Sequence, residues 1–189
     1  LAAHLAAAEA SNARLPYGPG DRWLVALGMF HVGGLAIAIR ALSGGGAVVF
    51  PEPGLELAAT VERRGVSHLS VVATQLAALV EARPTAPPTL REVLVGGGPI
   101  PGGLIDRALD GGYPLRTTYG STETASQITT TEPGQGAAAL RTAGRPLSCW
   151  ELRLDADGAI AVRGAPLPLA LLGDDGPAGR GNVVAAAGR

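Results

Sequence analysis

Short apolar runs alternate with amphipathic or alanine-rich segments over the first two thirds of the chain. The runs show no polar–apolar alternation, which is typical of strands buried on both faces. They predict strands at residues 23–27, 47–50, 68–72, 92–95 and 115–118. The segments before and between them predict helices at residues 2–12, 32–42, 55–64, 74–82 and 102–110. Alternating strands and helices imply βαβ units, so we predict an α/β fold with a mostly parallel sheet and flanking helices.

A different pattern follows. Residues 151–155 alternate polar and apolar side chains, which predicts a half-buried strand. Asp157-Gly158 is typical of a hairpin turn, and residues 159–163 provide the return strand. The mostly parallel sheet is therefore expected to be followed by a small antiparallel β unit.

These two patterns suggest how the chain is divided. We expect an α/β subdomain over residues 1–144, incomplete at its N-terminus, and the antiparallel unit over residues 145–172. Residues 173–189 are rich in Gly and Ala and show no clear period. We expect them to form a tail.

Charge and hydropathy exclude two classes of protein. The chain has 189 residues and a formal net charge of -1, which argues against a nucleic-acid binder that relies on bulk charge. The longest uncharged stretch, residues 23–39, contains His31 and three glycines. A membrane-spanning helix needs about 20 apolar residues, so we predict no membrane span.

Cysteine and lysine usage narrows the chemistry further. Cys149 is the single cysteine, which excludes an intramolecular disulfide and any site built from several cysteines. A lone cysteine fits a reducing compartment, and we expect a cytoplasmic protein. Every basic residue is an arginine. The absence of lysine excludes a Walker P-loop and a Schiff-base mechanism within this sequence.

Three unusual segments follow predicted strands: residues 28–31, 96–99 and 119–123. In open parallel sheets, ligands bind outside the carboxyl ends of the strands, so one edge could collect all three. Each segment also has a purely structural interpretation. The histidine could be packed or solvated, the glycines could form a tight turn, and the last segment could be a strand-to-helix turn.

The functional interpretation is a phosphate site. Glycines without a Cβ let the backbone approach a flat ring or a phosphate. The hydroxyls of Ser121 and Thr122 could hold that phosphate, and Tyr119 could stack on a base. Glu123 could then hold Mg²⁺, which prefers carboxylate and phosphate oxygens.

The same segments resemble a known family. Tyr119-Gly120-Ser121-Thr122-Glu123 resembles the Tyr-Gly-x-Thr-Glu motif of the AMP-forming acyl- and aryl-CoA ligases, an adenylate-forming superfamily. The longer string from Tyr119 to Thr130 is similar to the o-succinylbenzoate–CoA ligases of menaquinone synthesis. Residues 30–35 and 96–101 are similar to the same group. The resemblance covers most of residues 1–172.

The resemblance implies a nucleotide site for ATP and AMP. Tyr119 would stack on adenine, Thr122 would contact the α-phosphate, and Glu123 would hold Mg²⁺ on the ATP phosphates. Thr122 and Glu123 are thus the candidate catalytic residues. The resemblance also assigns nucleotide contacts to Gly96, Gly97, Gly98, Pro99, Gly120 and Ser121.

It further implies a site for an aromatic acid, 2-succinylbenzoate. His31 and Gly33 would border the acid, with Gly120, Ser126 and Gln127 nearby. A carboxylate would attack the α-phosphorus of ATP to give an acyl-adenylate and pyrophosphate. The thiol of CoA, as co-substrate, would then displace AMP. Catalysis would rest on positioning and on neutralising phosphate charge.

Two parts of the family pattern are missing from the sequence. They are the glycine-rich Ser/Thr loop that ends in Lys, and the C-terminal domain with the catalytic lysine. We therefore expect a central fragment that is inactive as this chain alone. Two alternatives stay open: a ligase of the superfamily for another acid, and a non-catalytic adenylate-binding module. A sheet without its N-terminal neighbours exposes an edge and apolar faces, so we also expect self-association.

Overall fold

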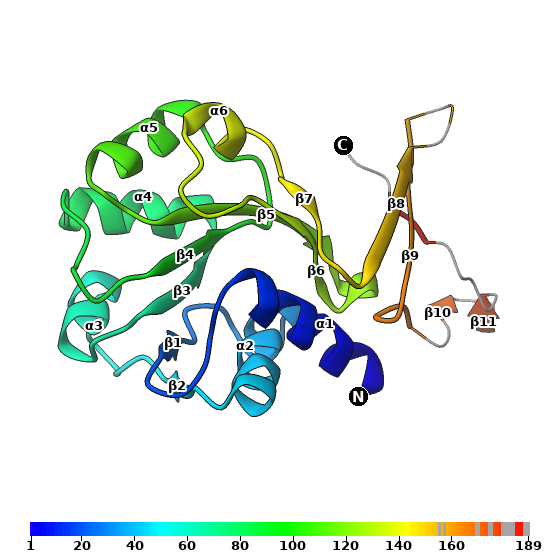
Figure 1. The fold of residues 1–189 in the computed structure, drawn as a ribbon. Coiled ribbons are helices and arrows are strands. Elements are labelled where there is room, and N and C mark those ends of the chain that lie inside the picture. Colours follow the sequence, from blue (N-terminus) through cyan, green and yellow to red (C-terminus); the bar gives the residue numbers. More distant parts are fainter. Residues whose placement is uncertain (155, 157, 169–170, 174–175, 179–183, 187–189) are drawn as a thin grey trace.

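The computed structural model describes residues 1–154, 156, 158–168, 171–173, 176–178 and 184–186, and Figure 1 shows the fold. A seven-stranded sheet with the order β2-β1-β3-β4-β5-β6-β7 forms its centre. The parallel strands are β1 (Arg22–Leu24), β2 (Ala47–Val49), β3 (His68–Val71), β4 (Glu92–Val95) and β5 (Leu115–Ser121). β6 (Ser126–Thr130) and β7 (Arg145–Pro146) extend the sheet in antiparallel fashion. The predicted α/β class with a mostly parallel sheet is confirmed.

Helices cover both faces of this sheet (Figure 1). They are α1 (Ala2–Arg14), α2 (Val32–Gly44), α3 (Leu57–Arg63), α4 (Ala73–Ala82), α5 (Gly102–Asp110) and the short α6 (Ala137–Leu140). Successive strand residues face opposite cores. Leu24 packs with the cluster under α3, α4 and α5, whereas Trp23 and Val25 pack with Ile37 of α2. This two-sided burial explains the continuous apolar runs of the sequence.

The antiparallel unit follows β7. β8 (Trp150–Leu154) and β9 (Ile160–Gly164) pair as the sequence predicts, although Asp157 of the predicted turn lies outside the described residues. Trp150 and Val162 pack against Ile128 of β6. One apolar cluster spans the expected boundary at residue 144, and β7 beyond it pairs with β6 before it. The division into two units remains a prediction.

Much of the expected tail, residues 173–189, lies outside the described residues, and the tail remains a prediction. β10 (Leu171–Gly173) pairs with β11 (Gly176–Ala178), and β12 (Val184–Ala186) pairs with β9. Strand pairing through backbone hydrogen bonds requires no periodic side-chain pattern, so the sequence gives little sign of it. Among the described residues, no helix is long and apolar enough to cross a membrane.

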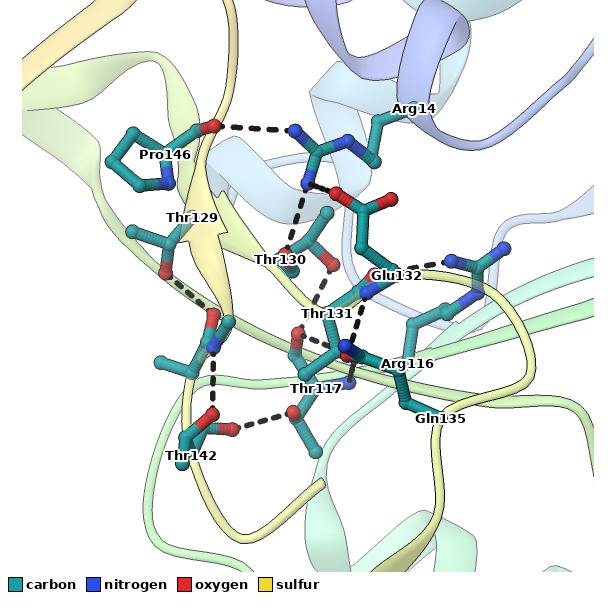
Figure 2. Close-up of polar contacts among 12 residues, drawn as sticks. Arg14, Arg116, Thr117, Thr129, Thr130, Thr131, Glu132, Gln135, Thr142 and Pro146 are labelled. Carbon is teal, nitrogen blue, oxygen red and sulfur yellow. Dashed lines mark hydrogen bonds and ion pairs between the residues drawn. The ribbon is translucent and has the colours of Figure 1, made fainter. Parts of the chain in front are cut away.

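Threonine hydroxyls bond to backbone carbonyls where the end of β6 and the residues after it lie beside the first half of β5 (Figure 2). The Thr130 hydroxyl donates to the Thr117 carbonyl at 3.0 Å, and the Thr117 hydroxyl donates to the Thr142 carbonyl at 2.6 Å. Arg14 of α1 donates to the Thr130 carbonyl at 3.2 Å and pairs with Glu132 at 2.9 Å. These bonds add to the backbone pairing, in which the Thr117 carbonyl also accepts from the Thr131 N–H at 3.0 Å, and they fix β6 beside β5.

Candidate functional site

A cavity of about 470 Å³ lies at the carboxyl ends of the parallel strands, as expected for this fold class. Segments after β1, β4 and β5 all contribute to its wall. Of the sequence-predicted residues, the lining includes His31, Gly33, Gly96, Gly97, Gly120, Ser121, Thr122, Ser126 and Gln127. The structure thus brings the three unusual segments together, and the roles of their residues remain predictions.

Four predicted residues are outside that lining: Gly98, Pro99, Tyr119 and Glu123. Gly98 and Pro99 are exposed in the turn after β4. Tyr119 is half-buried and packs against the apolar cluster that contains Ile128 and Trp150. Its proposed stacking on adenine remains a prediction.

The turn after β4 approaches β5 closely. A Cβ on Gly96 would lie 2.6 Å from the Thr118 side chain, and Gly97 has a φ of +81°. Glycine is therefore required at both positions, for space at the first and for the left-handed backbone at the second. The approach brings the backbone of this turn to the cavity wall beside Thr118.

The turn between β5 and β6 is tighter still. A Cβ on Gly120 would lie 1.6 Å from the Ser126 carbonyl oxygen. Ala125 and Ser126 have φ values of 52° and 103°, which are unfavourable for residues with a side chain. Such strain persists only where surrounding contacts impose it, and it often marks functional sites.

A buried threonine stabilises this strained turn. The Thr124 hydroxyl accepts from the Ser121 N–H at 3.0 Å and donates to the Ser121 carbonyl at 3.0 Å. The short 3₁₀ helix η1 (Thr122–Thr124) leaves Thr122 and Glu123 exposed. The backbone N–H of Glu123 and then the Ser121 hydroxyl lower the pKa of the Glu123 carboxyl. An ionised carboxylate suits a cation held mainly by phosphate oxygens.

Glu123 belongs to no larger group of potential metal ligands among the described residues. Within the described ranges, no group of three His, Cys, Asp or Glu side chains could hold a metal ion. A Mg²⁺ ion at Glu123 would therefore depend on ligand phosphates for most of its coordination. This agrees with the preference of Mg²⁺ for one or two carboxylates plus substrate phosphates.

Sequence reasoning missed Arg40, a cavity-lining residue that is 2% exposed. Its Nη2 donates to Gln127 Oε1 at 2.8 Å, and its guanidinium carbon lies 5.0 Å from the centroid of the Trp23 ring. Among the described residues, Nε has no hydrogen-bond partner and no carboxylate pairs with the guanidinium. Burial lowers the pKa of Arg40 to about 10, so it stays charged at neutral pH.

The signal that could have found Arg40 was present in the sequence. The segment that forms α2 is otherwise nearly all apolar, and Arg40 is its single charged residue. Arginine is almost never buried without a partner. A lone arginine in such a helix therefore indicates either a buried ion pair or an anion site.

His31 and its neighbours form an exposed edge beside the cavity. The Phe30 and His31 rings lie 4.4 Å apart, and Phe30 is 88% exposed. A second hollow, of about 590 Å³, lies between α4 and α5. None of the sequence-predicted residues lines it, so the first cavity is the candidate functional site.

The class of protein follows from comparison with known families. The model of a family described as AMP-binding enzyme matches residues 1–166. The chain belongs to this family. Its fold and the segments around its cavity agree with the adenylate-forming resemblance of the sequence.

Two curated relatives of this chain are both named 2-succinylbenzoate–CoA ligase. The chain is 35% identical over 159 residues to the 2-succinylbenzoate–CoA ligase of Bacillus subtilis, covering 83% of this chain and 33% of that protein. It is 36% identical over 161 residues to the Bacillus cereus ligase of the same name, covering 83% of this chain and 33% of that protein. The chain thus spans about a third of the length of the curated relatives it matches.

Solved structures agree with this comparison. The o-succinylbenzoate CoA synthetase of Bacillus subtilis in complex with its acyl-adenylate intermediate superimposes with a TM-score of 0.83 at 32% identity. The match covers 88% of this chain and 37% of that one. A structure of the same enzyme with ATP and magnesium gives a TM-score of 0.82 at 32% identity, covering 88% of this chain and 38% of that one.

Proposed function

We propose that this chain forms the central, adenylate-binding part of an ATP-dependent, AMP-forming 2-succinylbenzoate–CoA ligase. One observation carries the proposal: a single cavity is lined by the Gly96–Gly97 turn, by Ser121 and Thr122, and by the buried Arg40. A glycine turn and hydroxyls suit the adenylate, and a buried cation suits a second anionic group. An acyl-adenylate of a dicarboxylic acid carries both an adenylate and a second anionic group.

The reaction has two steps. A carboxylate of the acid attacks the α-phosphorus of ATP, the bond to pyrophosphate breaks, and an acyl-adenylate forms. The CoA thiol then attacks the acyl carbon and AMP leaves. Thr122 donates a hydrogen bond to the α-phosphate. Preorganised donors of this kind stabilise developing charge without reorganisation during the reaction.

When Mg²⁺ is bound, it neutralises part of the phosphate charge of ATP. Glu123 fits that ion because its carboxyl is exposed and its pKa is lowered. The chain itself holds no lysine, so its cationic contribution comes from arginine alone. We expect adenylate formation by this chain alone to be negligible, which an ATP–pyrophosphate exchange assay would check.

Arg40 favours 2-succinylbenzoate over acids with a single carboxylate. One carboxylate of 2-succinylbenzoate is consumed in the adenylate, and the other remains anionic. That second carboxylate compensates a guanidinium that is 2% exposed, bonds to the neutral Gln127 oxygen and pairs with no carboxylate of the described residues. A fatty acid or a simple aryl acid would leave the buried charge uncompensated, which is costly.

The test is calorimetric titration of the chain with a non-hydrolysable 2-succinylbenzoyl-adenylate mimic and, separately, with MgATP. Thr122→Ala is expected to weaken binding of the mimic about tenfold, the value of one hydrogen bond to a charged group. Glu123→Ala is expected to remove the effect of Mg²⁺ on ATP binding. Glu9→Ala, on the exposed face of α1, is the matched control.

The outcomes separate the alternatives. No binding of either ligand by a folded chain would overturn the proposal. Tight binding of an adenylate mimic that carries a different acid would favour another ligase of the superfamily. Binding in this chain, with no turnover when the lysine-bearing parts of the family pattern are supplied, would favour a non-catalytic adenylate-binding module.

Partners and location complete the proposal. We propose self-association of this chain, since Phe30, Leu42, Phe50 and Leu154 are between 59% and 88% exposed. Size-exclusion chromatography over a dilution series tests this, and a monomer at all concentrations would contradict it. Use of ATP and CoA, together with the single cysteine, supports a cytoplasmic location.

A further inference from the structure

The neutral partner of Arg40 is itself held by two hydroxyls from distant parts of the chain. Ser11 of α1 donates to Gln127 Oε1 at 2.6 Å, and Gln127 Nε2 donates to the Thr118 hydroxyl at 3.2 Å. Ser11 and Gln127 are 0% and 2% exposed. Water therefore does not compete for these bonds, and the network depends on protein groups.

Proton counting gives the direction of every bond in this network. The Thr118 hydroxyl donates its single proton to the Thr129 carbonyl at 2.6 Å. Toward Gln127 it can then only accept, so the NH₂ group of Gln127 must face Thr118. The carbonyl oxygen of Gln127 must consequently face Arg40.

The opposite orientation of the amide is unfavourable for both bonds at the Oε1 position. It would place the NH₂ group of Gln127 against Nη2 of Arg40, which is also a donor, and it would remove the acceptor of the Ser11 hydroxyl. In the observed orientation, both lone pairs of Oε1 are used, one by Ser11 and one by Arg40. The guanidinium is thereby held at one defined place.

A neutral acceptor positions Arg40 without cancelling its charge. A carboxylate at this position would compensate the cation internally. The amide oxygen instead leaves one full positive charge in the cavity wall, with Nε still unpartnered among the described residues. The network thus orients a cation and keeps it available to an anion.

We infer that Ser11 and Thr118 are positioning residues that set the specificity for acids with a second carboxylate, acting through Gln127 on Arg40. This inference rests on the proposed function, because it assigns to Arg40 the second carboxylate of the acid. Ser11 is outside the cavity lining, so it acts only through Gln127.

The experiment compares two non-hydrolysable adenylate mimics by calorimetry. One carries 2-succinylbenzoate, and the other carries the same acid with hydrogen in place of the second carboxylate. The measured quantity is the ratio of their dissociation constants. Ser11→Ala and Thr118→Val are expected to lower the preference for the dicarboxylate about tenfold, with little change for the other mimic.

Two control variants accompany these. Thr118→Ser keeps the hydroxyl and is expected to keep the wild-type ratio. Thr117→Val removes the hydroxyl of a neighbouring buried threonine that bonds to the Thr142 carbonyl, away from Gln127, and is also expected to keep it. Ser11→Ala places alanine inside a helix, where it is favourable, so this variant tests the inference even if Thr118→Val folds poorly.

Contrary outcomes are distinguishable. If Arg40→Met abolishes the preference but Ser11→Ala and Thr118→Val leave it unchanged, or weaken both mimics equally, the inference is overturned and the proposed function stands. If the wild-type chain binds both mimics equally, Arg40 has no role in specificity and the inference also fails. If the folded chain binds neither, the proposed function itself fails.

Discussion

Two buried arginines in this molecule are equally hidden from water and very differently partnered. Arg116 and Arg40 are each 2% exposed. Arg116, in β5, donates to both carboxylate oxygens of Glu92 at 2.7 and 2.6 Å and to the Thr131 carbonyl at 3.0 Å. Arg40 donates to one neutral oxygen and lies over the face of Trp23. The charge of Arg116 is compensated by a carboxylate of the protein, whereas the charge of Arg40 is not.

The two arginines also lie in different surroundings. Arg116 lies among the threonines of β5 and β6 in Figure 2, whose hydroxyls bond to backbone carbonyls. Burial raises the pKa of Glu92, although its hydrogen bonds to Arg116 and the charge of Arg116 oppose that rise. Arg40 lines a cavity. The difference teaches that burial alone does not distinguish a structural charge from a functional one. What distinguishes them is whether a protein group compensates the charge.

Removing the Glu92 carboxylate, the partner of Arg116, is expected to have the largest effect on stability. Glu92→Ala leaves Arg116 as an uncompensated buried cation. Breaking a buried pair on one side costs about 3–5 kcal/mol of unfolding free energy. Urea denaturation measures it. Glu52→Ala is the control, because its pairs with Arg63 and Arg64 are partly exposed and are worth at most about 1 kcal/mol. Equal losses in both variants would contradict the structural role of Arg116.

A carboxylate placed beside Arg40 is expected to make its surroundings resemble those of Arg116. Gln127→Glu places an anion beside Arg40 and compensates its charge internally. Affinity for the 2-succinylbenzoyl-adenylate mimic is expected to fall about 10- to 100-fold, the value of a hydrogen bond to a charged group. Calorimetry measures the change. Gln135→Glu makes the same substitution outside the cavity lining, and an equal fall there would show a general charge effect.

Removing the arginines themselves sharpens the comparison. Arg40→Met is expected to change the unfolding free energy by no more than about 1 kcal/mol, because Gln127 Oε1 keeps the Ser11 hydroxyl as a donor. Arg116→Met is expected to cost several times more, because it leaves the Glu92 carboxylate buried alone. Denaturation curves of the two variants side by side test this, and the reverse order would be inconsistent with our assignment.

The smallest expected effect is a pH dependence of stability that arises from His68, which contacts the Trp23 ring as Arg40 does. His68 stacks on Trp23 at 5.1 Å, its Nε2 donates to the Pro16 carbonyl at 3.0 Å, and its Nδ1 accepts from the Ser67 hydroxyl at 2.8 Å. Burial lowers the pKa of His68 below 6.5, although Asp21 opposes this with an oxygen 3.9 Å from Nδ1. The unfolded chain therefore takes up a proton near pH 6.5 that the folded chain does not.

Stability is accordingly expected to decrease as the pH falls through about 6.5 toward the folded-state pKa. Thermal melts between about pH 5 and 7.5 measure this decrease. The relevant quantity is the difference between the wild-type chain and His68→Gln, which lacks the titrating group. Parallel curves for the two proteins would show that His68 makes no contribution.

The sequence predicted the parallel sheet because its strands are buried on both faces and read as unbroken apolar runs. It also predicted that the segments after three strands meet, since parallel strands end at one edge. Strand β6 was not predicted: its residues Ser126–Thr130 are mostly polar, and their position depends on pairing with β5. Residues 119–123 are also compatible with a strand-to-helix turn, so the sequence does not indicate β6.

The candidate site was only partly predictable for the same reason. Gln127 was placed near the acid by family resemblance, whereas its bonds to Ser11 and Arg40 span 116 and 87 residues. No local pattern records such partners. Arg40 stood in an apolar helix with nothing in the neighbouring sequence to pair with, and its significance depends on which groups the fold brings to it.

The long separation between α1 and β6 has a consequence for how the cavity is built. Asn12 donates to the Arg40 carbonyl, and Ser11 and Arg14 donate to Gln127 and Thr130, so the first helix supports the cavity wall from outside its lining. On a ribosome, the helix emerges more than 100 residues before those strand partners. Contacts of such high sequence separation form late. Arg40 therefore acquires its Gln127 acceptor only after β6 has been synthesised.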